Sequence, residues 1–194
     1  MSPGHLHPGS TGFECARRRI LERIARSPVP EDPAHAENTL HWLLRLDPGA
    51  DTALQLAALA HDIERARPQR LRRDAFDDYD HFKQAHARQG ARLLEPLLRH
   101  CGLEEAVIRE ACRLVERHEF GGDPRADLLR EADSLSFFEV NLPLYHAREG
   151  EAEALRRCRW GVARLSPRGR ALLAERLPAD PALARIVVEA LETS

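Results

Sequence analysis

The chain has 194 residues, and alanine, leucine and arginine contribute 28 residues each. Valine, isoleucine and threonine, which favour strands, number only 7, 5 and 4. Because Ala, Leu and Arg are strong helix formers, this composition argues against sheet-based folds and predicts an all-α protein. The formal net charge is −2 at pH 7, with 29 basic and 31 acidic residues interleaved along the chain, so a nucleic-acid-binding module is not expected.

The sequence also allows predictions about the cellular compartment of the protein. It contains no apolar run near the roughly 20 residues that span a bilayer, so no membrane partner is expected. Residues 1–12 are polar and rich in Gly and Pro, without the apolar segment of a secretory signal, and we predict a disordered arm there. Cys15, Cys101, Cys112 and Cys158 are scattered, which predicts free thiols and a cytoplasmic protein.

Apolar residues at helical spacing predict a succession of helices after the arm. The expected helices cover residues 13–26, 32–46, 52–66, 80–100, 104–118 and 125–140. Asp32 before Pro33 is a typical helix start, with Asp32 as the N-cap. The stretch from Leu54 to Ala60 is apolar nearly all round, which predicts a central helix.

The pattern weakens beyond residue 140, where only shorter helices are expected. They cover residues 151–165, 168–177 and 181–191. We therefore predict one compact helical domain over residues 13–194, with a core over 32–140 and a C-terminal helical extension over 141–194. The extension contains no cluster of ligand-type residues, so it is expected to pad the core or to form a homodimer contact.

Several histidines and aspartates fall on the apolar faces of the predicted helices. They are His35, His61, Asp62, His86, His118 and Asp133, on five consecutive helices. Any one of them alone fits a hydrogen-bonded core residue. Four imidazoles and two carboxylates in one core are costly to bury unless something compensates them, and a metal ion does so directly. Nitrogen and carboxylate ligands suit Fe, Mn, Zn, Co or Ni, so the sequence predicts a transition-metal site.

The order of these residues resembles the HD-domain superfamily of metal-dependent phosphohydrolases. The signature of that superfamily is a His, a His-Asp pair and a later Asp on antiparallel helices, which here would be His35, His61-Asp62 and Asp133. The resemblance covers residues 32–140 and implies a helical bundle of that type. His86 and His118 fall where the dinuclear branches carry two further histidines, which implies two divalent metal ions. Asp62 would bridge them while His61 binds one.

The resemblance also implies a reaction and a substrate site. The expected function is hydrolysis of a nucleotide or another small phosphorylated metabolite by a metal-activated water, with Asp62, Arg65 and Glu119 as catalytic residues. Arg65 stands where many members carry a lysine near the substrate phosphate, although a solvated residue at a helix end fits equally well. Glu119 is a candidate acid or base, and a surface glutamate is the alternative.

Further substrate contacts are expected in the charged stretch over residues 71–83. The candidates are Tyr79, His81 and Lys83, and a solvated loop is the alternative interpretation. The sequence departs from the family pattern at Glu64, where a glycine is usual. The segment after His118 lacks the Gly-Tyr-Pro tripeptide of the cyclic-dinucleotide phosphodiesterases, so cyclic di-GMP is not assigned as substrate.

Two other functions compete with hydrolysis. The same six-ligand pattern occurs in mixed-valent diiron oxygenases that resemble this superfamily, including the myo-inositol oxygenase type, and residue spacing does not separate the two chemistries. A signalling or scaffold module that has lost its ligands is the non-enzymatic alternative. The presence of all six candidate ligands argues against it.

Overall fold

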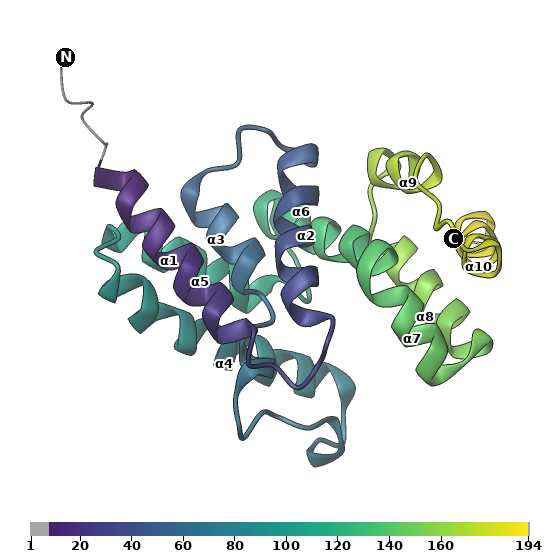
Figure 1. Ribbon diagram of the computed structural model, residues 1–194, viewed down its shortest axis with the longest axis horizontal. Helices are drawn as coiled ribbons and strands as arrows, with labels where there is room; N and C mark the ends of the chain where they lie inside the picture. The colour runs from purple at the N-terminus through teal and green to yellow at the C-terminus, as the bar shows by residue number, and fades with distance from the viewer. Residues whose placement is uncertain (1–7, 194) are drawn as a thin grey trace.

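The computed structural model describes residues 8–193, and over this range the chain is helical without any strand. The all-α prediction is therefore confirmed. The helices are α1 (Pro8–Ile24), α2 (Asp32–Leu46), α3 (Thr52–Ala60), α4 (Tyr79–His100), α5 (Glu105–Arg117), α6 (Pro124–Ser136), α7 (Leu142–Glu149), α8 (Glu151–Ala163), α9 (Pro167–Ala174) and α10 (Pro181–Glu192) (Figure 1). Short turns of other helix types lie at η1 (Ile63–Ala66), η2 (Arg73–Ala75) and the π-helical η3 (Phe137–Asn141).

The centre of the fold is α3, as its apolar sequence predicts. This helix packs against α1, α2, α5 and α6, and nearly all of its residues are buried. Asp51 caps its first turn, because the Oδ1 atom of Asp51 accepts a hydrogen bond from the Leu54 amide at 3.0 Å. Four neighbouring helices therefore surround α3.

The prediction that this helix continues to residue 66 is wrong. α3 ends at Ala60, and a turn at His61 and Asp62 leads into η1. The Nδ1 atom of His61 donates to the Ala58 carbonyl at 2.9 Å, which satisfies one of the carbonyl groups that a helix end leaves without a partner. His61 and Asp62 consequently leave the helix axis at the point where four other helices converge.

Two predictions about the N-terminal part and the cysteines need correction. α1 begins at residue 8, so part of the predicted disordered arm is helical, while residues 1–7 lie outside the described residues. Cys15 and Cys101 form a disulfide, so the prediction of free thiols is wrong for this pair. Packing of α1 against α4 brings their Cα atoms to 5.6 Å although 86 positions separate them. Cys112 and Cys158 are free.

The C-terminal helices α7 to α10 gather at one side of the molecule, beyond the end of α6 (Figure 1). α7 was not predicted, and it follows the π-helical turn η3 that prolongs α6. α8 packs against α6, α7 and α10, so the extension is joined to the core through α6. In the part of the chain that the structure describes, no helix combines the length and apolarity needed to cross a membrane.

The start of α6, the helix that carries Asp133, is held by Asp123. Its Oδ1 atom accepts hydrogen bonds from the amides of Arg125 and Ala126, at 3.1 Å each. Its Oδ2 atom lies 2.6 Å from Nη1 of Arg113 on α5. The hydrogen bond from Arg113 is the main reason why the pKa of Asp123 falls from 3.8 to about 2.

Asp123→Ala is expected to lower the free energy of unfolding by about 1–2 kcal/mol, because a helix cap and an interhelical ion pair are lost together. Asp123→Asn keeps the cap and should cost less. Since the folded-state pKa is depressed, the ionic contribution is complete above about pH 4 and is lost as the pH falls through about 2. Urea unfolding should show the difference between wild type and Asp123→Asn shrinking over that window. A difference that stays constant down to pH 2 would contradict the assignment.

Candidate metal centre

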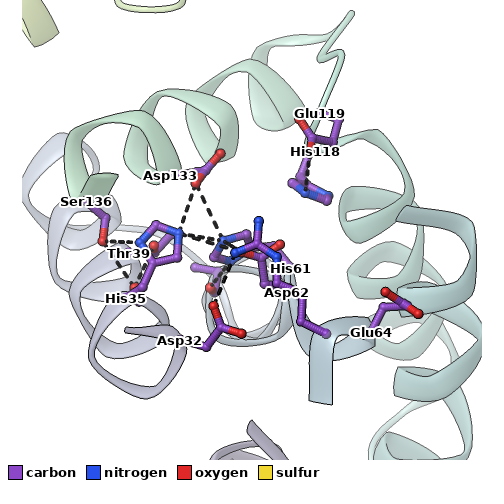
Figure 2. A network of polar contacts seen from close by, with 12 residues as sticks. Asp32, His35, Thr39, His61, Asp62, Glu64, His118, Glu119, Asp133 and Ser136 are labelled. Atoms are coloured by element: carbon purple, nitrogen blue, oxygen red, sulfur yellow. Dashed lines mark hydrogen bonds and ion pairs between the residues drawn. The ribbon is translucent and has the colours of Figure 1, made fainter. Parts of the chain in front are cut away.

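The structure brings all six predicted ligand residues to one place. His35 lies on α2, His86 on α4 and Asp133 on α6, while His61, Asp62 and His118 lie at the C-terminal ends of α3 and α5. The Oδ1 atom of Asp133 is 3.1 Å from Nε2 of His35 and 3.6 Å from Nε2 of His61, contacts that Figure 2 shows as dashed lines. The four histidines and Asp62 are buried.

Asp62 belongs to two groups of candidate ligands. One group comprises His35, His61 and Asp62, the other Asp62, His86 and His118, and within each group the ligand atoms lie within 4.8 Å of one another. The Oδ2 atom of Asp62 is 3.4 Å from Nε2 of His61, whereas its Oδ1 atom is 3.0 Å from Nε2 of His86. The two oxygens of one carboxylate therefore face different sets of imidazoles.

In all four imidazoles Nδ1 has a hydrogen-bond partner outside the cluster, and Nε2 is turned toward the centre. His61 and His118 donate from Nδ1 to the carbonyl three residues earlier, at 2.9 and 2.7 Å. The Nδ1 atom of His86 donates to Oε2 of Glu64 at 3.0 Å. A partner that accepts from Nδ1–H leaves the lone pair on Nε2, the form that binds metal.

In His35 the partner of Nδ1 is the Ser136 hydroxyl. The Ser136 hydroxyl donates to the His35 carbonyl, so its oxygen accepts from Nδ1 of His35 at 2.8 Å. Nε2 of His35 then faces Nε2 of His61 at only 3.1 Å. Two nitrogen lone pairs repel at this distance unless a proton or a metal ion lies between them. This pair is therefore a specific indication that the residues fit a cation.

Electrostatics keeps the carboxylates ionised in spite of burial. Burial raises the pKa of Asp62, but Arg65 and His61 outweigh it and hold that pKa well below its ordinary value. Burial lowers the pKa of His61, yet Asp62 and Asp133 raise it well above its ordinary value. Burial lowers the pKa of His118 to about 4, so this ring is neutral near pH 7. Two ionised carboxylates thus lie beside imidazoles, of which His118 is neutral, and this donor set suits a divalent cation.

The other predicted site residues are divided between the cavity and the surface. Arg65 lies beside the centre, with Nη1 2.8 Å from Oδ2 of Asp62. Lys83 is buried, and its Nζ atom is 3.0 Å from Oε2 of Glu119. Tyr79 lines the cavity described below, whereas His81 lies on the exposed side of α4 and does not line it. Tyr79 and Lys83 share a helix face at i and i+4, and a residue at i+2 points to the opposite side.

A cavity of about 630 Å³ opens onto the candidate ligands. Its wall includes His35, Asp62, His118 and Asp133 together with Glu119. The rest of the wall is rich in cationic and aromatic side chains, among them Arg65, Arg73, Tyr79, Phe137, Arg148, Arg156, Arg157, Trp160 and Arg164. The candidate metal centre is thus accessible from a pocket that carries six arginines.

The chain matches a known protein-family model. Residues 20–187 match the family model described as "Domain of unknown function (DUF4202)". The chain belongs to this family. Neither the curated proteins nor the solved structures contain a match to it. The description of DUF4202 names no activity, and the His/Asp groups of this chain are compatible with the HD-type resemblance.

The sequence analysis missed the cavity residues that this DUF4202 chain contributes from α7 and α8. Arg157, Trp160 and Arg164 lie at i, i+3 and i+7, which places them on one face of α8. This spacing was the available signal. It was missed because arginines on an amphipathic helix ordinarily face solvent.

Ser136→Ala in this DUF4202 chain is expected to weaken metal binding by about tenfold, because outer hydrogen-bond partners orient metal-binding imidazoles. Ser134→Ala is the matched control, since Ser134 is also buried on α6 but donates to the Arg130 carbonyl. A competition titration against a chromophoric chelator measures both affinities. Equal affinities for the two variants would show that Ser136 does not support the centre.

Proposed function

We propose that this protein is a metal-dependent phosphohydrolase with a dinuclear metal centre. The observation that carries the proposal is the division of the Asp62 carboxylate between two sets of imidazoles, all presenting Nε2. His35, His61 and Asp133 would hold one divalent ion together with Oδ2 of Asp62. His86 and His118 would hold a second together with Oδ1. Iron, manganese, zinc, cobalt and nickel all suit this ligand set.

The residues around the centre have distinct tasks in the proposed reaction. Bound divalent ions would supply an activated water near neutral pH and would stabilise charge on the attacked phosphoryl group. Arg65 would bind a phosphoryl oxygen, because Arg65 lines the cavity and its planar guanidinium matches the arrangement of phosphate oxygens. Glu119 is ionised, since the positive charges of Lys83 and Arg164 outweigh burial and lower its pKa. Its Oε1 atom would accept a proton from the attacking water.

A phosphorylated small molecule is the substrate class that the cavity favours. The wall is polar and carries arginines on several sides, and guanidinium groups bind phosphate oxygens through paired hydrogen bonds. A cavity of about 630 Å³ is of the size that small-molecule sites have. The substrate would be a nucleotide or another phosphorylated metabolite.

The test combines metal analysis with turnover under air and without oxygen. Purified protein should contain stoichiometric metal and hydrolyse p-nitrophenyl phosphate or bis(p-nitrophenyl) phosphate with Mn²⁺ or Co²⁺, also under anaerobic conditions. A chelator should abolish the activity. His61→Ala should lose metal, while His81→Ala, an exposed histidine outside the cavity, should keep it.

Two results would overturn the proposal. Turnover that requires oxygen, with an absorbance change on substrate addition and no phosphatase activity, would assign the protein to the diiron oxygenases. Protein without stoichiometric metal, together with unchanged metal uptake by His61→Ala, would exclude both enzymatic functions.

A further inference from the structure

Arg157 is the cavity arginine that, among the described residues, has neither a carboxylate partner nor a hydrogen bond, since Arg73, which also lacks a carboxylate partner, donates to the Phe76 carbonyl. Among the described residues, no carboxylate lies within ion-pair distance of Arg157, and its side chain makes no hydrogen bond. Two neighbouring arginines of the same cavity are paired, Arg156 with Glu153 and Arg148 with Glu31. Arg157 is partly buried, and the loss of water around it lowers its pKa. No carboxylate therefore pairs with its charge at contact distance, although Asp133 and Glu119 lie near enough to favour it.

Aromatic rings hold Arg157 in place instead. The guanidinium carbon lies 3.9 Å from the centroid of the Trp160 ring and 4.7 Å from that of Phe137. An aromatic face attracts a cation without using its N–H groups. The donors of Arg157 consequently stay free, in a fixed position on the cavity wall.

The Trp160 ring also contacts Arg164, which pairs with one of the candidate metal ligands. Arg164 lies 4.2 Å from the Trp160 centroid, and its Nη2 atom is 3.3 Å from Oδ2 of Asp133. The Arg164 side chain is only 7% exposed, and its Nε atom is buried without a hydrogen-bond partner. Lys83 lies 4.0 Å from the same ring. Three cations thus surround Trp160, and the part of the cavity next to it adjoins the metal ligands.

A partly buried cation without a direct partner is unfavourable, and an anion that enters the cavity would compensate it. We propose that Arg157, with Arg164 and Trp160, binds a second anionic group of the substrate, a phosphate or a carboxylate, at some distance from the phosphoryl group that reacts. The part of this inference that concerns the reacting group rests on the proposed phosphohydrolase function. The substrate class is thereby narrowed to small molecules with two anionic groups. Because cations surround Trp160, we do not expect it to serve as a stacking platform for a nucleobase.

The anion site is tested first by binding, without any turnover. Inorganic phosphate is titrated into the full-length protein by calorimetry, with a chelator present so that bound metal does not contribute. Arg157→Gln is expected to weaken phosphate binding by about tenfold. Arg159→Gln is the matched control on α8, because Arg159 is exposed and pairs with Glu189. Its phosphate affinity should equal that of the wild type.

Equal phosphate affinity in wild type and Arg157→Gln, or no phosphate binding by the wild type, would overturn the inference. Thermal unfolding checks that each variant is folded. Arg157→Lys keeps the charge but loses the planar fork, so it should bind phosphate with intermediate affinity. This variant keeps the test decisive if Arg157→Gln does not fold.

A matched substrate series then identifies the second anion. Glycerol 3-phosphate has no second anionic group, 3-phosphoglycerate adds a carboxylate, and 2,3-bisphosphoglycerate adds a further phosphate. We expect the KM to be about tenfold lower for at least one of the two compounds with added charge. Arg157→Gln should remove that preference, and Arg159→Gln should retain it.

The two proposals fail in different ways. Hydrolysis of all three compounds without preference, and without an effect of Arg157→Gln, would overturn the second anion site and leave the phosphohydrolase intact. Absence of any hydrolysis, with phosphate binding that depends on Arg157, would overturn the phosphohydrolase and support the anion site.

Discussion

Replacing Asp62 by asparagine is expected to abolish the proposed metal binding and to lower the proposed phosphohydrolase activity by about a thousandfold, which corresponds to several kcal/mol of transition-state stabilisation. The amide keeps the size of the side chain but removes the charge. Both oxygens of Asp62 face imidazole nitrogens, at 3.4 Å from His61 and 3.0 Å from His86. Loss of this one charge should therefore weaken both ligand groups. Elemental analysis of the purified variant, with activity assays in added Mn²⁺, measures both effects.

Asp32→Asn is the control for metal content. Asp32 is buried close by and its Oδ1 atom lies 3.2 Å from Nη1 of Arg65, but it belongs to neither ligand group. The control variant should retain the wild-type metal stoichiometry. Asp62→Asn protein that retained the full amount of metal would rule out the bridging role.

Lys83→Met is expected to lower the free energy of unfolding by about 3 kcal/mol, because it leaves the Glu119 carboxylate buried without its closest partner. Lys83 is 5% exposed and the Glu119 side chain 12%. In a chain of this length the loss corresponds to a fall of about 6–12 °C in Tm. The double variant Lys83→Met, Glu119→Gln should regain most of the stability, since no unpaired charge remains. Thermal and urea unfolding of the two single variants and the double variant provide the cycle.

The same cycle separates structure from catalysis at Glu119. If Glu119 accepts the proton, the double variant should be folded and metal-loaded but have a kcat well below that of the wild type. Arg88→Met is the control, because Arg88 on α4 pairs with Glu116 at the surface and should cost less than about 1 kcal/mol. A Lys83→Met variant as stable as Arg88→Met would show that the buried pair contributes little.

Local sequence patterns determined most of the helical framework. α2 spans the predicted residues 32–46, because a proline in its first turn and the Asp47-Pro48-Gly49 turn delimit it. The predicted N-cap was wrong, because Asp32 is the first residue of the helix and Glu31 holds the cap position without a side-chain hydrogen bond. The six candidate ligands were also visible, since polar side chains on an apolar helix face conflict with the periodicity around them. The all-α fold and the set of residues that meet in the core thus follow from short-range information.

Contacts between distant segments decided the rest. α3 ends at Ala60, and His61 turns toward His35 on α2 and Asp133 on α6, which are distant in the sequence. The Cys15–Cys101 disulfide depends on packing of α1 against α4, which no local spacing reveals. The orientation of each imidazole depends on Ser136, Glu64 or a backbone carbonyl, which becomes visible only once the helices are in place.

The three most abundant residue types differ in how much of the structure they determine. The 28 alanines and 28 leucines determined that the chain is helical, since their propensity acts residue by residue. The environment of the 28 arginine side chains could not be predicted in the same way, because an arginine on a helix can face solvent, form an ion pair or line a binding site. Only the tertiary structure distinguished Arg159, paired at the surface, from Arg157, held by two aromatic rings in the cavity. The physical reason is that a guanidinium takes its role from the groups around it, and those groups come from other helices.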